Sequence, residues 1–141
     1  MPIYHCIADQ TLLDGDIRSR IAAEITAIHC KLTGAPPSFV HVLFQAMPEG
    51  TRFSGGVAST ISIVRAEWRG GRPIAVKQEA LRMIAEMWAR ETGTPVASVL
   101  ASITDTPAGA ILEMGHITPE PGDEAAWFAR HGLGTATATA T

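Results

Sequence analysis

The chain has 141 residues, of which 46% are hydrophobic and 18% charged, with a formal net charge of −3 at pH 7. This length and composition predict one globular domain with a real core. The negative net charge excludes a general attraction to nucleic acid or an anionic membrane, so any anion must be bound by locally placed cations. No apolar run approaches the roughly 18–20 residues that a membrane helix needs. We therefore expect a small-molecule partner.

The two cysteines, Cys6 and Cys30, have no metal-binding spacing. No basic segment precedes an apolar run of the kind that directs secretion. Nothing beside either cysteine in the sequence would activate a thiolate, so we expect both to be small core residues. A reducing, cytoplasmic location fits best.

Residues 2–48 predict a strand, a helix and a second strand. The first strand spans residues 2–8, which are rich in β-forming side chains. The helix spans residues 14–32, because apolar residues recur at helical steps of four, four, three and four: Ile17, Ile21, Ile25, Ile28 and Leu32. Residues 39–46 form the second strand, and residues 47–50 have the composition of a turn.

The ends of this helix also have signals. Asp14 or Asp16 is a candidate side-chain cap for the first turn. Gly34 can take the left-handed conformation that ends a helix, and prolines at positions 36 and 37 cannot continue one.

The sequence repeats itself at a shift of 59 positions. The shift places residues 33–36 (Thr-Gly-Ala-Pro) on residues 92–95 (Thr-Gly-Thr-Pro), and it superimposes Val40 on Val99 and Pro48 on Pro107. A second unit at about residues 61–107 follows, with a strand at 61–68, a helix at 73–91 and a strand at 99–105. The chain is therefore a tandem β-α-β duplication.

Two such units predict an α/β (α+β) domain over residues 1–131. Right-handed crossovers give a four-stranded sheet of mainly parallel units, with both helices on one face. The other face stays uncovered and apolar, which predicts oligomerisation. A short amphipathic segment at 123–131 carries the Trp127-Phe128 pair, and the Thr-Ala-rich residues 132–141 are expected to be a disordered tail.

Pro2 is the first candidate for chemistry. If Met1 is removed, the chain begins with a secondary amine on a rigid ring, and such an amine can act as a general acid or base. An ordinary α-amino group has a pKa of about 7.7–8, which burial or nearby cations lower further. A Met-Pro start is common, however, and by itself carries no functional meaning.

Arg69 and Arg72 lie across a Gly-Gly turn between the third strand and the second helix. A guanidinium is permanently charged and matches a carboxylate in bidentate geometry, so the pair suits a small carboxylic acid. The alternative is two solvated loop arginines.

His29 and Glu113 are weaker candidates. His29 lies at the edge of the apolar helix face, where an imidazole is usually a packing residue. Glu113 follows an apolar segment that could raise its pKa or let it orient a water molecule. Three other histidines, His5, His41 and His116, show no metal-triad spacing, so we assign no metal site.

Together, several short motifs carry a resemblance that covers the chain to about residue 131. In order and spacing, the chain resembles the cis-3-chloroacrylic acid dehalogenase group of the tautomerase superfamily through these residues: Pro2, His29 with Leu32-Thr33-Gly34, Phe53-Ser54-Gly55-Gly56-Val57, Arg69-Gly70-Gly71-Arg72, Pro107-Ala108, Glu113-Met114-Gly115, Pro119-Glu120-Pro121-Gly122 and Trp127-Phe128. The resemblance implies a homotrimer that acts without a cofactor.

Carried over residue by residue, the resemblance implies roles for five side chains. Pro2 would transfer the proton, Arg69 and Arg72 would bind the substrate carboxylate, and His29 and Glu113 would bind substrate or activate water. One position departs from the family: Ser102 stands where the dehalogenases have a catalytic tyrosine. We keep Ser102 as a substrate-binding candidate, and its short hydroxyl counts against efficient dehalogenation.

Three functions remain open from the sequence. The favoured one is keto–enol tautomerisation of 2-oxo or enolic carboxylic acids, with weak hydratase or dehalogenase activity on 3-substituted acrylic acids. The first alternative is a cis-3-haloacrylate dehalogenase or unsaturated-acid hydratase. The second is a trimeric binding protein with a relic site.

Overall fold

Two strand–helix–strand units build the centre of the molecule, as the repeat predicts. In the computed structural model, which describes residues 1–133, the first unit comprises β1 (Ile3–Asp9), α1 (Ile17–Thr33) and β2 (His41–Met47). The second comprises β5 (Ser62–Arg69), α2 (Ile74–Thr92) and β6 (Val99–Thr106). The predicted boundaries differ from these by three residues at most. Short 3-10 helices link the elements: Gln10–Leu12, Pro37–Phe39, Val96–Ser98 and Ala108–Ala110.

The helices end as their sequences predict, but α1 does not begin as predicted. Gly34 is left-handed, with φ 74°, and its N–H donates to the Cys30 carbonyl at 2.9 Å. Asp16 occupies the N-terminal cap position without a side-chain hydrogen bond to the helix. Its backbone is already helical (φ −83°, ψ −1°), whereas a capping side chain needs an extended backbone to reach the free N–H groups.

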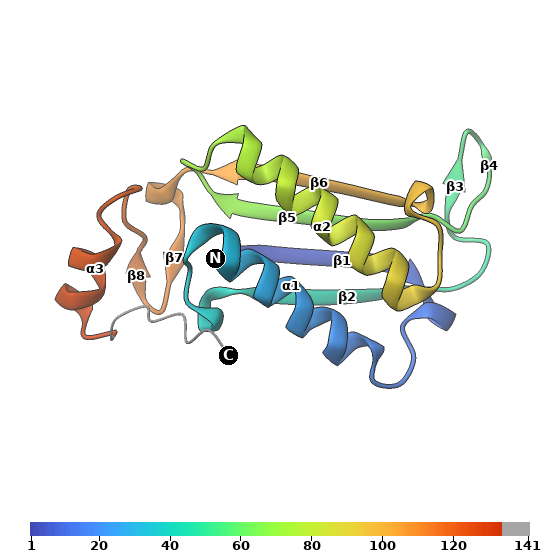
Figure 1. Ribbon diagram of the computed structural model, residues 1–141, viewed down its shortest axis with the longest axis horizontal. Coiled ribbons are helices and arrows are strands. Elements are labelled where there is room, and N and C mark those ends of the chain that lie inside the picture. The colour runs from blue at the N-terminus through green and yellow to red at the C-terminus, as the bar shows by residue number, and fades with distance from the viewer. Residues whose placement is uncertain (134–141) are drawn as a thin grey trace.

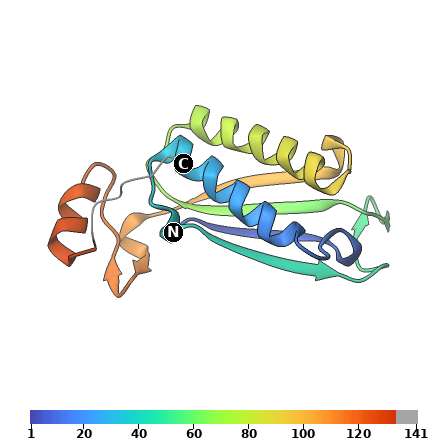
Figure 2. The same cartoon turned by 60° about the horizontal axis from the view of Figure 1, so that its bottom comes forward.

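The sheet has the order β2-β1-β5-β6, with β1 and β5 antiparallel in the middle and a parallel strand outside each. Both long helices lie over the same face of this sheet (Figures 1 and 2). Alternate side chains of the central strands point into this layer, and the α1 face predicted from its spacing packs against them. The main core includes Tyr4, Cys6, Ala8, Ile21, Ile25, Val64, Ala66, Trp68, Ile84, Met87 and Trp88.

The duplication extends further than the sequence analysis predicted. A hairpin of β3 (Phe53–Ser54) and β4 (Val57–Ala58) follows the first unit, and one of β7 (Leu112–Glu113) and β8 (His116–Ile117) follows the second. The shift of 59 residues places one hairpin on the other. Because β1 and β5 are antiparallel, the two hairpins lie at opposite ends of the sheet (Figure 1).

Both hairpins turn through two residues with positive φ. Gly55 and Gly56 have φ 58° and 79°, and Met114 and Gly115 have φ 51° and 83°. Two such residues match the right-handed twist of the flanking strands, which is why these turns join short hairpins. Met114 is the one non-glycine residue with positive φ in the described part of the chain.

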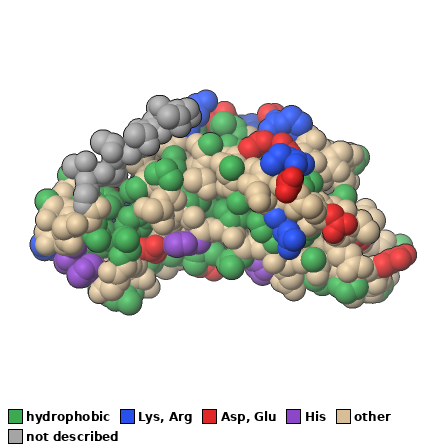
Figure 3. Space-filling model, turned by 90° about the horizontal axis from the view of Figure 1, so that it is seen from below, with side chains coloured by type: hydrophobic (Ala, Val, Ile, Leu, Met, Phe, Trp, Pro, Cys, Tyr) green, Lys and Arg blue, Asp and Glu red, His purple; other side chains and the backbone are tan. Residues whose placement is uncertain are grey.

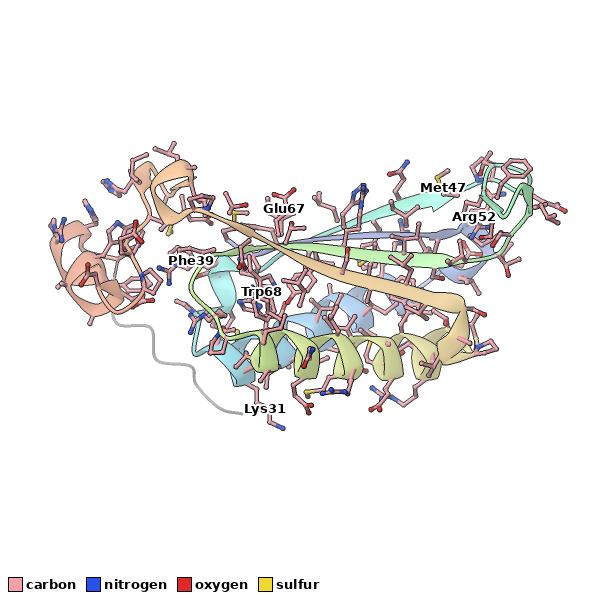
Figure 4. The ribbon with its side chains drawn as sticks, turned by 90° about the horizontal axis from the view of Figure 1, so that it is seen from above. Lys31, Phe39, Met47, Arg52, Glu67 and Trp68 are labelled. Atoms are coloured by element: carbon pink, nitrogen blue, oxygen red, sulfur yellow. The ribbon has the colours of Figure 1, made fainter. Side chains whose placement is uncertain are left out.

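The outer face of the sheet is mixed rather than apolar. On β5, Trp68 points toward the helices and Glu67 points to the opposite side (Figure 4). Exposed Leu43 and Leu100 lie on the outer strands, but exposed Arg65 and Glu67 lie between them on β5. The prediction of a bare apolar face is therefore wrong in this respect, because a central strand places charges there.

The C-terminal segment closes the end of the sheet where the N-terminus lies (Figure 1). Helix α3 (Glu124–His131) confirms the predicted amphipathic segment, and Trp127 and Phe128 pack on Phe39 in a second apolar cluster. The indole N–H of Trp127 donates to the Ile117 carbonyl at 2.8 Å. No helix among residues 1–133 is long and apolar enough to cross a membrane. Most of the predicted disordered tail, from residue 134 on, lies outside the described residues.

Candidate functional site

A pocket of about 300 Å³ opens between the C-terminal end of α1, the turn after β5 and the C-terminal segment. Its lining includes Met1, Gly34, Phe39, Arg69, Arg72 and Trp127. In the view from below, hydrophobic side chains gather on the half of the molecule that carries α3, while most of the visible charged side chains lie on the other half (Figure 3). The pocket therefore combines an apolar wall with two arginines.

The two arginines of the pocket have different partners. Arg69 donates to the Pro119 carbonyl at 2.5 Å and to Oε1 of Glu124 at 2.5 Å, so its guanidinium is committed to the C-terminal segment. Within residues 1–133, the Arg72 guanidinium has no hydrogen-bond or ion-pair partner. Burial, and then the charge of Arg69, lower the pKa of Arg72. Arg72 is thus a half-buried cation that can still accept an anion.

The turn that carries these arginines depends on Gly71. Its φ is 112°, and a Cβ atom built there would lie 2.2 Å from Cγ of Pro121. A side chain at this position would collide with the loop that holds Arg69. Gly71 therefore permits the close approach of the two segments.

Glu113 anchors the amino end of the chain. Its Oε2 accepts from the Met1 ammonium at 2.8 Å, and its Oε1 lies 2.7 Å from Nε2 of His41. Burial raises the pKa of Glu113, but the hydrogen bonds from these two groups outweigh it, so the net pKa lies below the ordinary value. The Pro2 ring is fully buried, and its carbonyl accepts from the His41 N–H at 3.0 Å.

His29 belongs to a buried aromatic network. Its Nδ1 lies 2.9 Å from the Tyr4 hydroxyl, which accepts from the Trp68 indole N–H at 3.0 Å. Burial lowers the pKa of His29 to about 3, and the charges of Arg72 and the amino terminus add to the shift. His29 is therefore neutral at neutral pH.

Five of the six residues predicted for the site belong to one end of the molecule. Arg69 and Arg72 line the pocket, and Glu113 binds the amino terminus next to Pro2. The His29 carbonyl accepts from the hydroxyl of Thr33, which also lines the pocket. The sixth is elsewhere.

Ser102 is not brought to this pocket. It lies on the outer side of β6 and lines a separate hollow of about 320 Å³ with His5 and Arg65. The sequence held a signal for this, because Ser102 alternates with Ala101 and Ile103, which pack against the core.

Sequence reasoning missed three partners of the site: Tyr4 as the partner of His29, His41 as the partner of Glu113 and Glu124 as the partner of Arg69. Each pair is separated by 25 residues or more, and no local pattern encodes such a contact.

Comparison with known proteins places the chain in a family. Residues 1–131 match the family described as "Putative oxalocrotonate tautomerase enzyme". A search of curated proteins gave no match. The crystal structure of native Ps01740 is 36% identical, with a TM-score of 0.76, and the match covers 79% of this chain and 99% of that one.

Two further structures extend the comparison. N1, a member of the cis-3-chloroacrylic acid dehalogenase family, is 27% identical, with a TM-score of 0.87 and coverage of 93% of this chain and 94% of that one. Native fused 4-OT is 20% identical, with a TM-score of 0.74 and coverage of 82% and 94%, which shows a shared fold. The resemblance predicted from the motifs is confirmed: this chain belongs to the tautomerase superfamily, in the family whose model matches residues 1–131.

Proposed function

We propose that the protein is a cofactor-independent tautomerase that moves a proton within 2-oxo or enolic carboxylic acids. Its proton-transfer group is the Pro2 amine, which becomes free when Met1 is removed. The observation that carries this proposal is the Arg72 guanidinium, which lines a pocket beside the amino terminus and has no partner among residues 1–133. Such a cation can bind a carboxylate in bidentate geometry, which suits a carboxylic-acid substrate.

Arg72 binds the substrate carboxylate, and Arg69 supports the pocket. Arg69 already pairs with Glu124, so it supports the pocket wall and adds positive charge to the site without binding the carboxylate itself. As the substrate approaches its enediolate-like transition state, negative charge develops near the carboxylate. Cations placed there in advance stabilise that charge more than they stabilise the ground state.

The reaction needs one group that accepts a proton from the substrate and then returns a proton to it. The neutral Pro2 amine removes the proton from the 2-hydroxyl of the enol, and the electron pair forms the C2=O bond. The resulting ammonium returns a proton to C3, so no net change in the enzyme occurs. The nearby positive charges of Arg69 and Arg72 favour the neutral amine over the ammonium form.

A second branch requires the opposite protonation state of Pro2. The ammonium form would protonate C2 of an unsaturated acid while Glu113 activates a water molecule that attacks C3. If C3 carries a halogen, halide then leaves. Ser102 does not line this pocket and has no phenol, so we rank hydration and dehalogenation below tautomerisation.

We also propose that the protein assembles as a homotrimer. Three fused 4-OT structures of the same fold are described as trimers. On this chain, the outer sheet face combines exposed Leu43 and Leu100 with charged side chains. An interface there would bury the leucines and pair the charges between copies.

The proposal is tested by comparing the two reaction classes on the same preparation. Ketonisation of the enol of a 2-oxo acid is followed by absorbance, and halide release is followed with cis-3-chloroacrylate. We expect ketonisation to be the faster reaction. No ketonisation by protein with a free Pro2 amine would contradict the proposal. If 2-oxo acids then also failed to raise the melting temperature, the site would be a relic.

A further inference from the structure

We infer that Tyr4 and Trp68 are positioning residues that hold neutral His29 in the tautomer with its proton on Nε2. This inference deepens the proposed function, because it gives His29 one role in the pocket. It starts from three side chains that are almost completely buried: Tyr4 is 0% exposed, Trp68 1% and His29 4%.

The geometry links the three groups in a chain. The Trp68 indole nitrogen lies 3.0 Å from the Tyr4 hydroxyl oxygen, and that oxygen lies 2.9 Å from Nδ1 of His29. The His29 ring also meets the Trp68 ring edge-on, with centroids 4.7 Å apart and an interplanar angle of 87°. The imidazole is therefore fixed in orientation as well as in hydrogen bonding.

Counting protons assigns the direction of each bond. An indole nitrogen can only donate, so the Tyr4 oxygen accepts from Trp68. Burial raises the pKa of Tyr4 well above the ordinary value, so its hydroxyl keeps its proton. Only one arrangement gives that proton a partner: the Tyr4 hydroxyl donates to Nδ1 of His29.

The opposite arrangement carries a penalty. If Nδ1 carried the proton, the Tyr4 oxygen would accept twice and its own hydrogen would point into the core. A buried donor without a partner loses its hydrogen bond to water and gains none in exchange, which is unfavourable. Nδ1 is therefore the acceptor, and the proton of neutral His29 lies on Nε2.

The Nε2–H group is then free to donate. Within residues 1–133, Nε2 of His29 forms no hydrogen bond. Two side-chain atoms there are both fully buried and unpaired, Arg52 Nε and Trp88 Nε1, and Nε2 of His29 is not one of them. Nε2 therefore keeps contact with solvent. His29 lies one helical turn before Thr33, whose hydroxyl donates to the His29 carbonyl at 2.8 Å and which lines the pocket, so this donor lies beside the pocket.

This assignment changes the role of His29 in the reaction. A neutral imidazole that presents N–H can stabilise the developing enolate or carboxylate oxygen, but it cannot accept a proton through that nitrogen. Water activation in the hydratase branch would then depend on Glu113 alone. The network thus favours an electrophilic donor over a general base at position 29.

Nitrogen-15 NMR of the full-length protein without ligand reads the tautomer directly. In wild type we expect His29 to show a pyrrole-type Nε2 and a pyridine-type Nδ1 shift. Tyr4→Phe removes the donor to Nδ1 and should produce a tautomer mixture with a kcat/KM about tenfold lower. The matched control is Trp88→Phe, since Trp88 is equally buried, lies one repeat after His29 and has an unpaired indole N–H. The control should keep the wild-type spectrum.

Two results would overturn the inference: a protonated Nδ1 in wild type, or an unchanged pure Nε2–H spectrum in Tyr4→Phe. The wild-type spectrum alone can do so, even if the variant folds poorly. The spectrum requires no substrate. If the protein gives the expected spectrum but is inactive on every 2-oxo acid, the proposed function is rejected and the positioning role of Tyr4 is retained.

Discussion

The Nη2 atom of Arg69 lies 2.5 Å from Oε1 of Glu124, so the first arginine of the Gly-Gly turn is tied to the first turn of α3. The second arginine, Arg72, has no equivalent tie within residues 1–133. The two arginines therefore contribute differently to the pocket: Arg69 holds its wall, and Arg72 offers its charge. Their separate substitution distinguishes these contributions.

Arg72→Ala should lower kcat/KM for a 2-oxo acid by about 10²–10³-fold, because it removes a charge-assisted contact to the carboxylate and to the developing negative charge. The free energy of unfolding should change little, since no group among residues 1–133 loses a partner. Arg82→Ala is the matched control, because Arg82 is exposed and its one ion pair within residues 1–133 is a surface pair with Glu79. Equal kinetics in both variants would remove Arg72 from the site.

Arg69→Ala should instead loosen the C-terminal segment. The substitution removes the hydrogen bonds to Pro119 and Glu124 together. We expect the free energy of unfolding to fall by about 1–2 kcal/mol. This value is small because Glu124 is partly exposed, and solvent weakens its ion pair with Arg69. Urea unfolding measures the loss, and Glu124→Gln, which keeps the Pro119 bond, should lose less. A fully stable Arg69→Ala protein would show that this pair does not hold α3.

Gly71→Ala should disturb both stability and substrate binding. The added methyl group would overlap Pro121 and would also force a side chain onto a positive φ, at a combined cost of about 2–3 kcal/mol. The melting temperature and KM report the two effects. Gly109→Ala is the control, because no atom lies within 4 Å of its added Cβ and its φ is not positive. Equal melting temperatures for the two variants would show that Pro121 moves aside freely.

His29 should make stability depend on pH. Its folded pKa of about 3 lies below the ordinary 6.5, so between these values the unfolded chain binds a proton that the folded chain rejects. The contribution of neutral His29 is fully present above pH 6.5 and is lost as pH falls, by up to about 1.4 kcal/mol per pH unit. The difference in unfolding free energy between wild type and His29→Gln should therefore shrink on acidification. Carboxylate contributions are common to both proteins and cancel. Parallel curves from pH 7 to pH 4 would contradict the assignment.

Hydrophobic spacing and the internal repeat were enough to predict the centre of this fold. The isoleucines of α1 and the shift of 59 residues located two helices and four strands. They could do so because each element buries one face, and the residues of that face recur in the sequence at a period typical of a helix or a strand. The hairpins were missed, since two-residue strands have no period. Only the paired turns at Gly55-Gly56 and Met114-Gly115 mark them.

The candidate site could be predicted as a set of residues but not as a geometry. The sequence could have placed Ser102 on the outer face of the sheet, because Ser102 alternates with Ala101 and Ile103, which pack against the core. The contacts of Tyr4 with His29 and of Glu113 with His41 join distant segments. Such contacts are fixed by the packing of whole elements, so no local pattern specifies them.

The proposed reaction depends on a free amine at Pro2. The most direct test is intact mass spectrometry of the purified protein, together with a ketonisation assay of wild type and Pro2→Ala. We expect a mass that lacks methionine and a fall in kcat/KM of at least about 10²-fold in Pro2→Ala, because the variant loses a general acid–base group. A retained methionine in active protein, or activity indifferent to Pro2, would contradict it.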